Sequence, residues 1–243
     1  MTRPRIHSEI ARTTAERITV RGHDLTDLIG SVSLGDMAFL EVLGRLPTPD
    51  ESTVFNAITV ALVEHGLTPS AVATRLTLLG APESLQGAVA AGLLGLGDRF
   101  GGPVENVARM LQEAGDATAA EIVKGFRDAR QPVPGVGHPQ HIQGDPRVPR
   151  LFEVAAAHGL SGRHVRLMQK IGEAASYATG KLLPVNATGA IGAIASELGL
   201  GWHACRGLAV MARAIGLVAH VQEEQERPIA RAILEGMEDE DPH

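Results

Sequence analysis

Residues able to move protons and bind anions gather in one irregular stretch, residues 134–147, with the sequence PGVGHPQHIQGDPR. Two histidines, His138 and His141, stand here near Asp145 and Arg147. Histidines with a carboxylate could bind a metal ion. Alternatively, His138 could act as a general acid or base while Arg147 binds a carboxylate. A solvated loop of turn residues is the third interpretation, and composition alone leaves all three open.

Two further stretches place polar or flexible groups directly before a predicted helix. In DRFGGPVEN, the pair Gly101 and Gly102 could present backbone N–H groups to an anion, or simply form a tight helix–helix corner. In LLPVNATGAIGAI, Asn186 or Thr188 could serve as the helix N-cap. Either stretch could line a binding site, and either could be purely structural.

Isolated charged residues offer a second set of candidates. Arg213 lies in the apolar helical segment AVMARAIGLVAHV, where a guanidinium needs a partner, either a structural carboxylate or a substrate carboxylate. Arg227 stands just before Pro228 at a predicted helix start. His65 lies at a predicted helix end, where burial or capping would account for it equally well.

The bulk composition indicates a globular chain that does not bind nucleic acid. The 243 residues are 44% apolar and 21% charged, enough for one large domain or two smaller ones. A net charge of -6 argues against a basic nucleic-acid face, and no segment is expected to span a membrane. The N-terminal segment lacks the apolar core of a secretory signal, and the single Cys205 fits a reducing compartment. We therefore expect a cytoplasmic protein.

Helical periodicity dominates the whole chain, and aromatic residues make up only 3% of it. Ser33, Thr48 and Thr68 are expected to cap helices, two of them followed by proline. The nearly wholly apolar helix within residues 82–97 should be buried. No strand ladder is evident, so these patterns predict an all-α fold with short connections.

Taken together, these stretches resemble the citrate synthase superfamily. PGVGHPQHIQGDPR is similar to its Gly-x-Gly-His … Asp-Pro-Arg loop. The segments EHGLTPS, AAGLLGLGDRFGGPVEN, LPVNATGAIGAIASELGL and ARAIGLVAHVQEEQERP follow in the family's order and spacing. The resemblance extends from about Gly22 onward and is closest to the short members called citryl-CoA lyases.

This resemblance implies an all-α homodimer whose active site lies in a cleft between two helical domains. The large domain would comprise residues 1–105 and 203–243, and the small domain residues 106–202. The family joins or splits a C–C bond between an acyl-CoA thioester and a 2-oxo acid. Coenzyme A would therefore be present as a thioester substrate, oxaloacetate is the expected type of oxo acid, and no metal is expected.

The resemblance also assigns roles to residues. His138 matches the histidine that bonds the keto or hydroxyl oxygen, and Arg147 and Arg213 match carboxylate-binding arginines. Arg227 matches an arginine that reaches in from the partner subunit, and His65 matches a histidine near the oxo acid. The turn that lets coenzyme A approach the backbone corresponds to Gly135, Val136 and Gly137.

Two positions depart from the family pattern on the thioester side. Phe100 precedes Gly101 and Gly102 where citrate synthases have a histidine that stabilises the enol. Thr188, in the segment that begins at Asn186, stands where they have the aspartate that exchanges the α-proton. Phenylalanine cannot donate a strong hydrogen bond, and a threonine hydroxyl is a poor base. Enolate stabilisation would then come from the Gly101–Gly102 backbone or from water.

Two classes of function follow from this pattern. The first is a citryl-CoA lyase-like enzyme that uses His138, Asn186 and Thr188 in catalysis. The second is a catalytically impaired or repurposed relative that binds a carboxylate or coenzyme A ligand as a regulatory or partner subunit. Turnover of an acyl-CoA and 2-oxo acid pair distinguishes the two.

Overall fold

The computed structural model describes residues 8–137 and 143–236, and its first element is a small sheet. Strands β1 (Ala11–Thr13), β2 (Ile18–Val20) and β3 (His23–Asp24) form an antiparallel sheet in that order. The expectation of no strand ladder was wrong for this segment. Strands of two or three residues are too short to show the alternation by which a strand is recognised in sequence. The rest of the described chain is helical, as the sequence predicts.

The first helices begin at the residues that their sequence marks as caps. The short α1 (Leu25–Leu28) follows the sheet, and α2 (Leu34–Leu43) starts after Ser33 with a complete capping box. Thr48 caps α3 (Pro49–Val63) in the same way, and Thr68 caps α4 (Pro69–Gly80). These predicted helix starts are confirmed, because a cap depends on local sequence alone.

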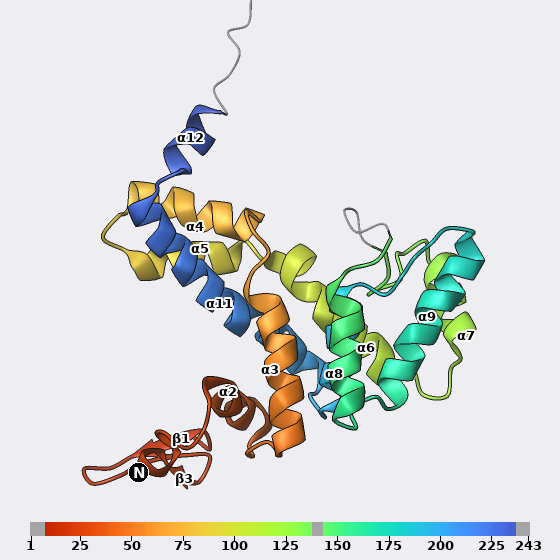
Figure 1. The fold of residues 1–243 in the computed structure, drawn as a ribbon, viewed down its shortest axis with the longest axis horizontal. Coiled ribbons are helices and arrows are strands. Elements are labelled where there is room, and N and C mark those ends of the chain that lie inside the picture. The colour runs from red at the N-terminus through yellow and green to blue at the C-terminus, as the bar shows by residue number, and fades with distance from the viewer. Residues whose placement is uncertain (1–7, 138–142, 237–243) are drawn as a thin grey trace, which may run out of the picture.

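A layer of helices packs around the 25-residue α11 (Trp202–Glu226), which runs diagonally across Figure 1. Helices α3, α4 and α5 (Leu85–Leu94) contact it, and α12 (Ala230–Glu235) packs on α4. The prediction that the apolar helix within residues 82–97 is buried was wrong for this isolated chain. Leu94 is 84% exposed, and only Ala88 and Gly92 of α5 are buried. An exposed apolar helix face of this kind is typical of a surface that another subunit or protein covers.

The remaining helices form the part of the molecule at the right of Figure 1. A π-helical turn η1 (Gly97–Gly101) leads into α6 (Gly102–Gln112), followed by α7 (Ala119–Asp128), α8 (Arg147–Ala157) and α9 (Arg163–Thr179). Helix α10 (Ala187–Glu197) packs against α6, α8 and α9 and is almost wholly buried. Its alanines and glycines let neighbouring backbones approach, and Gly192 leaves no room for a Cβ beside Val107.

The two-domain division stays a prediction. Its first boundary, after residue 105, falls inside α6, and α6 packs on both α10 and α11. A hinge at this position would have to bend a continuous helix.

Helix α11 is also long and apolar enough, by length and composition alone, to cross a membrane. Half of its most apolar window is buried inside the structure, and it carries Arg213 and His220. These features are typical of a core helix in a globular protein.

Candidate active site

The first part of the predicted catalytic loop, residues 135–137, is held in place by residues 184–186, which precede α10. Val136 forms an isolated antiparallel bridge with Val185. The N–H of Gly137 donates to the carbonyl of Pro184 at 2.7 Å, and the N–H of Asn186 donates to the carbonyl of Gly135 at 2.9 Å. Two segments about fifty residues apart thus form one unit. His138 and His141 lie outside the described residues, so their predicted roles stay predictions.

The glycines of this loop are required by conformation and by packing. Gly135 and Gly137 have φ of +81° and +71°, in the left-handed region that favours glycine. A Cβ on Gly135 would lie 2.8 Å from the Cα of Gly189 on α10. Gly135 therefore allows close packing against α10. The predicted approach of coenzyme A to the Gly135–Gly137 backbone stays a prediction.

Asn186 and Thr188 have definite structural jobs at the start of α10. The side-chain oxygen of Asn186 accepts the N–H of Gly189 at 3.0 Å, which confirms the predicted N-cap. Its Nδ2 donates to the carbonyl of Gly137 at 2.8 Å, and the Thr188 hydroxyl donates to Oδ1 at 2.8 Å. The hydroxyl proton of Thr188 is thus used in the bond to Asn186, while the hydroxyl oxygen can still accept a hydrogen bond. Both residues position the loop, and their catalytic roles stay predictions.

Arg147 is the first residue of α8, and a buried carboxylate fixes its guanidinium. Its Nε and Nη2 donate to the two carboxylate oxygens of Asp145 at 3.0 and 2.7 Å, and Nη1 donates to the carbonyl of Ala61 at 3.2 Å. The Asp145 side chain is 0% exposed, whereas that of Arg147 is 30% exposed. These bonds use three of the five N–H donors of a guanidinium. The remaining donors are available to an anion from the solvent side.

Arg213 lies mid-way along α11 in a largely buried position, close enough to Arg147 for the charge of that residue to affect its pKa. Its side chain is 11% exposed, and Nη1 lies 3.5 Å from Oε1 of Glu64, a loose ion pair. Burial lowers the pKa of Arg213, Glu64 raises it, and the charge of Arg147 lowers it further. The guanidinium nevertheless stays protonated at neutral pH. A nearly buried cation with one loose partner, beside a second cation, suits a multiply charged anion.

His65 and Arg227 lie in different parts of the molecule, His65 after α3 and Arg227 at the end of α11. His65 is exposed just beyond the end of α3, and its backbone N–H donates to Oε1 of Glu64 at 2.7 Å. Arg227 is the exposed C-cap residue of α11. It lies 14 residues after Arg213, which at the rise of an α-helix is about 21 Å along the axis. Within one chain, the structure brings Arg147, Arg213 and His65 into one region but does not bring Arg227 there.

Sequence reasoning considered Asp145 only as a possible metal ligand, and it did not predict that Asp145 and Glu64 orient these cations. Asp145 was visible two positions before Arg147, and Glu64 directly precedes His65. His220 and Arg75 carried no local signal, because their contacts join α4 to α11 and depend on tertiary packing. Arg206 of α11 was also missed. It pairs with Asp98 at 2.7 Å and with Glu105 at 2.6 Å beside the Gly101–Gly102 segment.

Comparisons with known proteins identify the family of this chain. The sequence matches the family described as citrate synthase, C-terminal domain, over residues 36–233. The chain belongs to this family. It is 30% identical to ATP-citrate synthase beta chain protein 1 of Oryza sativa subsp. japonica over 190 residues, which are 69% of this chain and 31% of that protein. It thus spans about a third of the length of that relative.

Comparison with solved structures indicates the same family. Citryl-CoA lyase from Hydrogenobacter thermophilus superposes with a TM-score of 0.90 at 34% identity, covering 98% of this chain and 94% of that one. ATP citrate lyase from Methanothrix soehngenii, in complex with citrate and coenzyme A, gives a TM-score of 0.83 at 20% identity and covers 100% of this chain and 43% of that one. The all-α citrate synthase fold predicted from the sequence is confirmed.

The segment predicted to lie on the thioester side is helical. Phe100 is half-exposed and lies in η1, and Gly101 and Gly102 continue helically into α6. The expected turn at Gly101 and Gly102 was wrong, because both residues are helical. In a π-helix the N–H groups donate to carbonyls five residues earlier, so these two glycines do not present free donors. The proposal that their backbone stabilises the enolate is therefore not supported.

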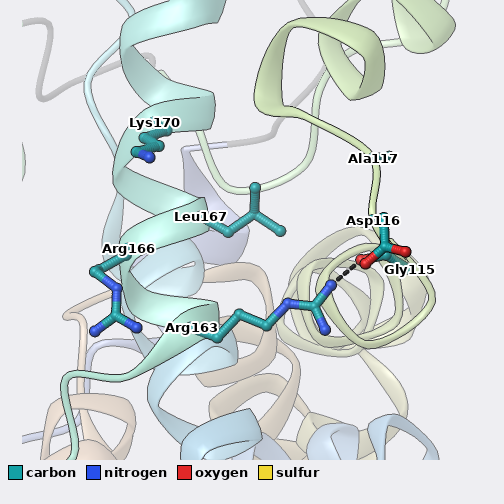
Figure 2. Close-up of a pocket in the computed structure, with 7 residues that line it drawn as sticks. All are labelled: Gly115, Asp116, Ala117, Arg163, Arg166, Leu167 and Lys170. Carbon is teal, nitrogen blue, oxygen red and sulfur yellow. Dashed lines mark hydrogen bonds between the residues drawn. The ribbon is translucent and has the colours of Figure 1, made fainter.

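Cationic side chains also line a cavity of about 310 Å³, away from the Gly135–Asn186 unit (Figure 2). Arg163, Arg166 and Lys170 line it from α9, opposite Asp116, and Arg163 donates to the carbonyl of Gly115. None of the residues assigned to the predicted site lines this cavity. Across the described ranges, no group of three or more His, Cys, Asp or Glu side chains could hold a metal ion.

Proposed function

We propose that this protein is a citryl-CoA lyase-like enzyme, which cleaves or forms the C–C bond between the acyl group of a coenzyme A thioester and a 2-oxo acid. The observation that carries the proposal is the presence of two cations at the end of α3: Arg147 of α8 bonds the carbonyl of Ala61, and Arg213 of α11 contacts Glu64. Asp145 and Glu64 orient them without satisfying all their donors. A substrate with several carboxylates, such as the citryl group, supplies the missing acceptors.

The reaction in the cleavage direction fits the groups around this pair. The tertiary hydroxyl of citryl-CoA loses its proton, the adjacent C–C bond breaks, and its electron pair moves into the thioester as an enolate. The hydroxyl carbon becomes the ketone of oxaloacetate, and protonation of the enolate carbon gives acetyl-CoA. His138 is the proposed acceptor of the hydroxyl proton. Arg147 and Arg213 hold the carboxylates while negative charge builds on the neighbouring oxygen.

Cleavage of citryl-CoA by the purified protein tests the proposal. Oxaloacetate release is followed through NADH consumption by added malate dehydrogenase. Arg147→Gln and Arg213→Gln should each lower kcat/KM at least 100-fold, a loss typical of positioning groups. Lys170→Gln, which removes an exposed cation of α9, is the matched control and should leave the rate unchanged. Wild-type protein without turnover of citryl-CoA, or equal rates for all four proteins, would contradict the proposal.

A second function, a ligand-binding relative without catalysis, is favoured by Phe100 and Thr188. The first has no polar group, and the second has its proton engaged by Asn186. This function predicts that citrate, oxaloacetate or coenzyme A raises the unfolding temperature without turnover. Arg147→Gln and Arg213→Gln would then remove the shift for the carboxylates and retain it for coenzyme A.

We also propose that the protein acts as a homodimer, in which Arg227 completes the site of the partner. Exposed apolar residues on α3, α5 and α11 support a covered face: Val60, Leu85, Leu94, Val210, Ile215 and Val218. The separation of about 21 Å between Arg227 and Arg213 also fits contribution across an interface.

Subunit mixing tests the dimer and the shared site together. If Arg213→Gln and Arg227→Gln are each inactive, their mixed dimers contain one site in which both arginines are intact. Random exchange should then restore about a quarter of the wild-type activity. Mixtures that stay inactive although light scattering shows dimers would place Arg227 outside the partner's site.

A further inference from the structure

A cluster of ionisable residues with a buried centre connects α4 with α11 and has no role in the chemistry described so far. It comprises Glu64 after α3, Arg75 of α4, and His220, Glu223 and Glu224 of α11. The Arg75 side chain is only 1% exposed, and His220 and Glu224 are also buried. A buried ion pair stabilises a fold little more than apolar side chains of similar volume. We therefore consider which neighbouring residues the cluster holds in position, since its contribution to stability is small.

The contacts of Arg75 fix the protonation of His220. Nε and Nη2 of Arg75 lie 3.2 and 2.8 Å from Nδ1 of His220. A guanidinium can only donate, so Nδ1 must be the unprotonated, accepting nitrogen. The imidazole is then neutral with its proton on Nε2. This buried nitrogen lies 3.2 Å from Oε2 of Glu64, close enough for electrostatic attraction but without the geometry of a hydrogen bond.

Glu64 transmits this constraint to Arg213. Its Oε2 faces His220, which leaves Oε1 for Arg213 at 3.5 Å and for the backbone N–H groups of His65 and Gly66 at 2.7 and 2.8 Å. Burial alone would raise the pKa of Glu64, but the backbone N–H of His65, the His220 ring and the charge of Arg213 hold it below its usual value. The carboxylate is thus an anion with a fixed orientation.

The other end of the cluster fixes the turn that carries Arg227. Nη1 of Arg75 donates to Oε2 of Glu224 at 2.7 Å. Oε1 of Glu224 accepts the backbone N–H groups of Ile229 and Ala230 at 2.9 and 2.8 Å, at the start of α12. Arg227 lies within the chain segment that Glu224 closes in this way. One continuous set of contacts therefore connects Arg213 with the segment bearing Arg227.

We propose that His220 is a positioning residue for carboxylate binding, which orients Glu64 and Arg213 through its Nε2–H and receives its own orientation from Arg75 through Nδ1. This inference rests on the proposed function, because it assigns a purpose to the arginines of that site. It predicts that the two ring nitrogens contribute differently: loss of the Nε2 donor disturbs Arg213, whereas loss of the Nδ1 acceptor disturbs Arg75 and the turn before α12.

Two isosteric substitutions separate these contributions. His220→Asn places an amide oxygen near the Nδ1 position and removes the donor to Glu64. His220→Gln places an amide nitrogen near the Nε2 position and retains that donor. His220→Asn should raise the Kd for oxaloacetate, measured by calorimetry, roughly tenfold, with the Kd for coenzyme A unchanged. His220→Gln should bind oxaloacetate within about threefold of wild type.

The outcomes distinguish the positioning role from the function on which it rests. Equal oxaloacetate affinities for wild type and His220→Asn overturn the role of His220 while the proposed function stands. Equal losses for oxaloacetate and coenzyme A also overturn it, since they indicate general disruption. A wild-type protein that binds no 2-oxo acid overturns both. Histidine nitrogen NMR of the wild type needs no variant: an unprotonated Nδ1 on His220 supports the assignment, and a protonated Nδ1 refutes it.

Discussion

Replacement of Asp145 by asparagine tests how strongly one buried carboxylate organises the site. Asp145 accepts three hydrogen bonds from Arg147, from its backbone N–H and from Nε and Nη2. Asparagine preserves the shape but loses the charge, and its NH2 group would face Nη2 of Arg147, donor against donor. Breaking a buried ion pair costs about 3–5 kcal/mol. Since Arg147 is 30% exposed and can be rehydrated, we expect a loss of about 2–3 kcal/mol in the free energy of unfolding.

The assay combines urea unfolding, thermal melting and citryl-CoA cleavage. A loss of this size should lower the melting temperature by roughly 5–10 °C in a chain of this length. Misplacement of Arg147 should lower kcat/KM roughly 100-fold, mainly through the affinity for the carboxylates. Glu153→Gln is the matched control, because it removes an exposed partner of Arg150 on the same helix, and such a pair contributes less than about 0.5 kcal/mol.

The reasoning would be refuted by either of two results. Equal unfolding free energies for Asp145→Asn and Glu153→Gln would show that the buried pair is no stronger than the exposed one. A destabilised Asp145→Asn protein with unchanged kcat/KM would show that Arg147 needs no orientation by Asp145.

Other predictions concern the loop, the acid stability and the thiol. Gly135→Ala should destabilise the fold by about 1–3 kcal/mol in urea unfolding, since φ is +81° and the α10 backbone blocks the Cβ, whereas Gly125→Ala, a helical position with open space, should stabilise it slightly. The bond from Arg45 holds the pKa of Glu51 at about 2, below the usual 4.5, so this pair stabilises the fold above about pH 4.5. That contribution is lost as the pH falls towards about 2, and Glu51→Gln should flatten this part of the melting curve against pH. Burial raises the pKa of Cys205 to about 12, so a thiol reagent should label it at mildly alkaline pH only as fast as the protein opens.

Local rules predicted the helices well because each helix start depends on its neighbours in sequence. Ser33, Thr48 and Thr68 cap helices where expected. The same rules failed where structure depends on a partner. The helix containing Leu94 is apolar enough for a core but is exposed in the single chain. The sheet before α1 was missed because its strands are too short to show a period.

The candidate site was only partly predictable for a related reason. Arg147 and Arg213 were identified through a family pattern that preserves order along the chain. Their orientation depends on Asp145 and Glu64, and that of Glu64 depends on His220 and hence on packing between α4 and α11. The Gly101–Gly102 segment suggested a turn, since glycine permits one, but the chain continues through a π-helical turn into α6.

The carboxylate side and the thioester side of the proposed site differ in how well they can stabilise negative charge. This difference affects which step of the reaction the protein assists. On the carboxylate side, Arg147 and Arg213 are oriented by Asp145 and Glu64, and in the proposed reaction they hold the substrate carboxylates. On the thioester side, Phe100 is apolar, and the nearby cation Arg206 is already paired with Asp98 and Glu105. Negative charge is thus stabilised best at the start of cleavage and least at the enolate. We therefore expect C–C cleavage to depend mainly on the carboxylate side, with solvent supplying the proton that an aspartate at the position of Thr188 would otherwise exchange.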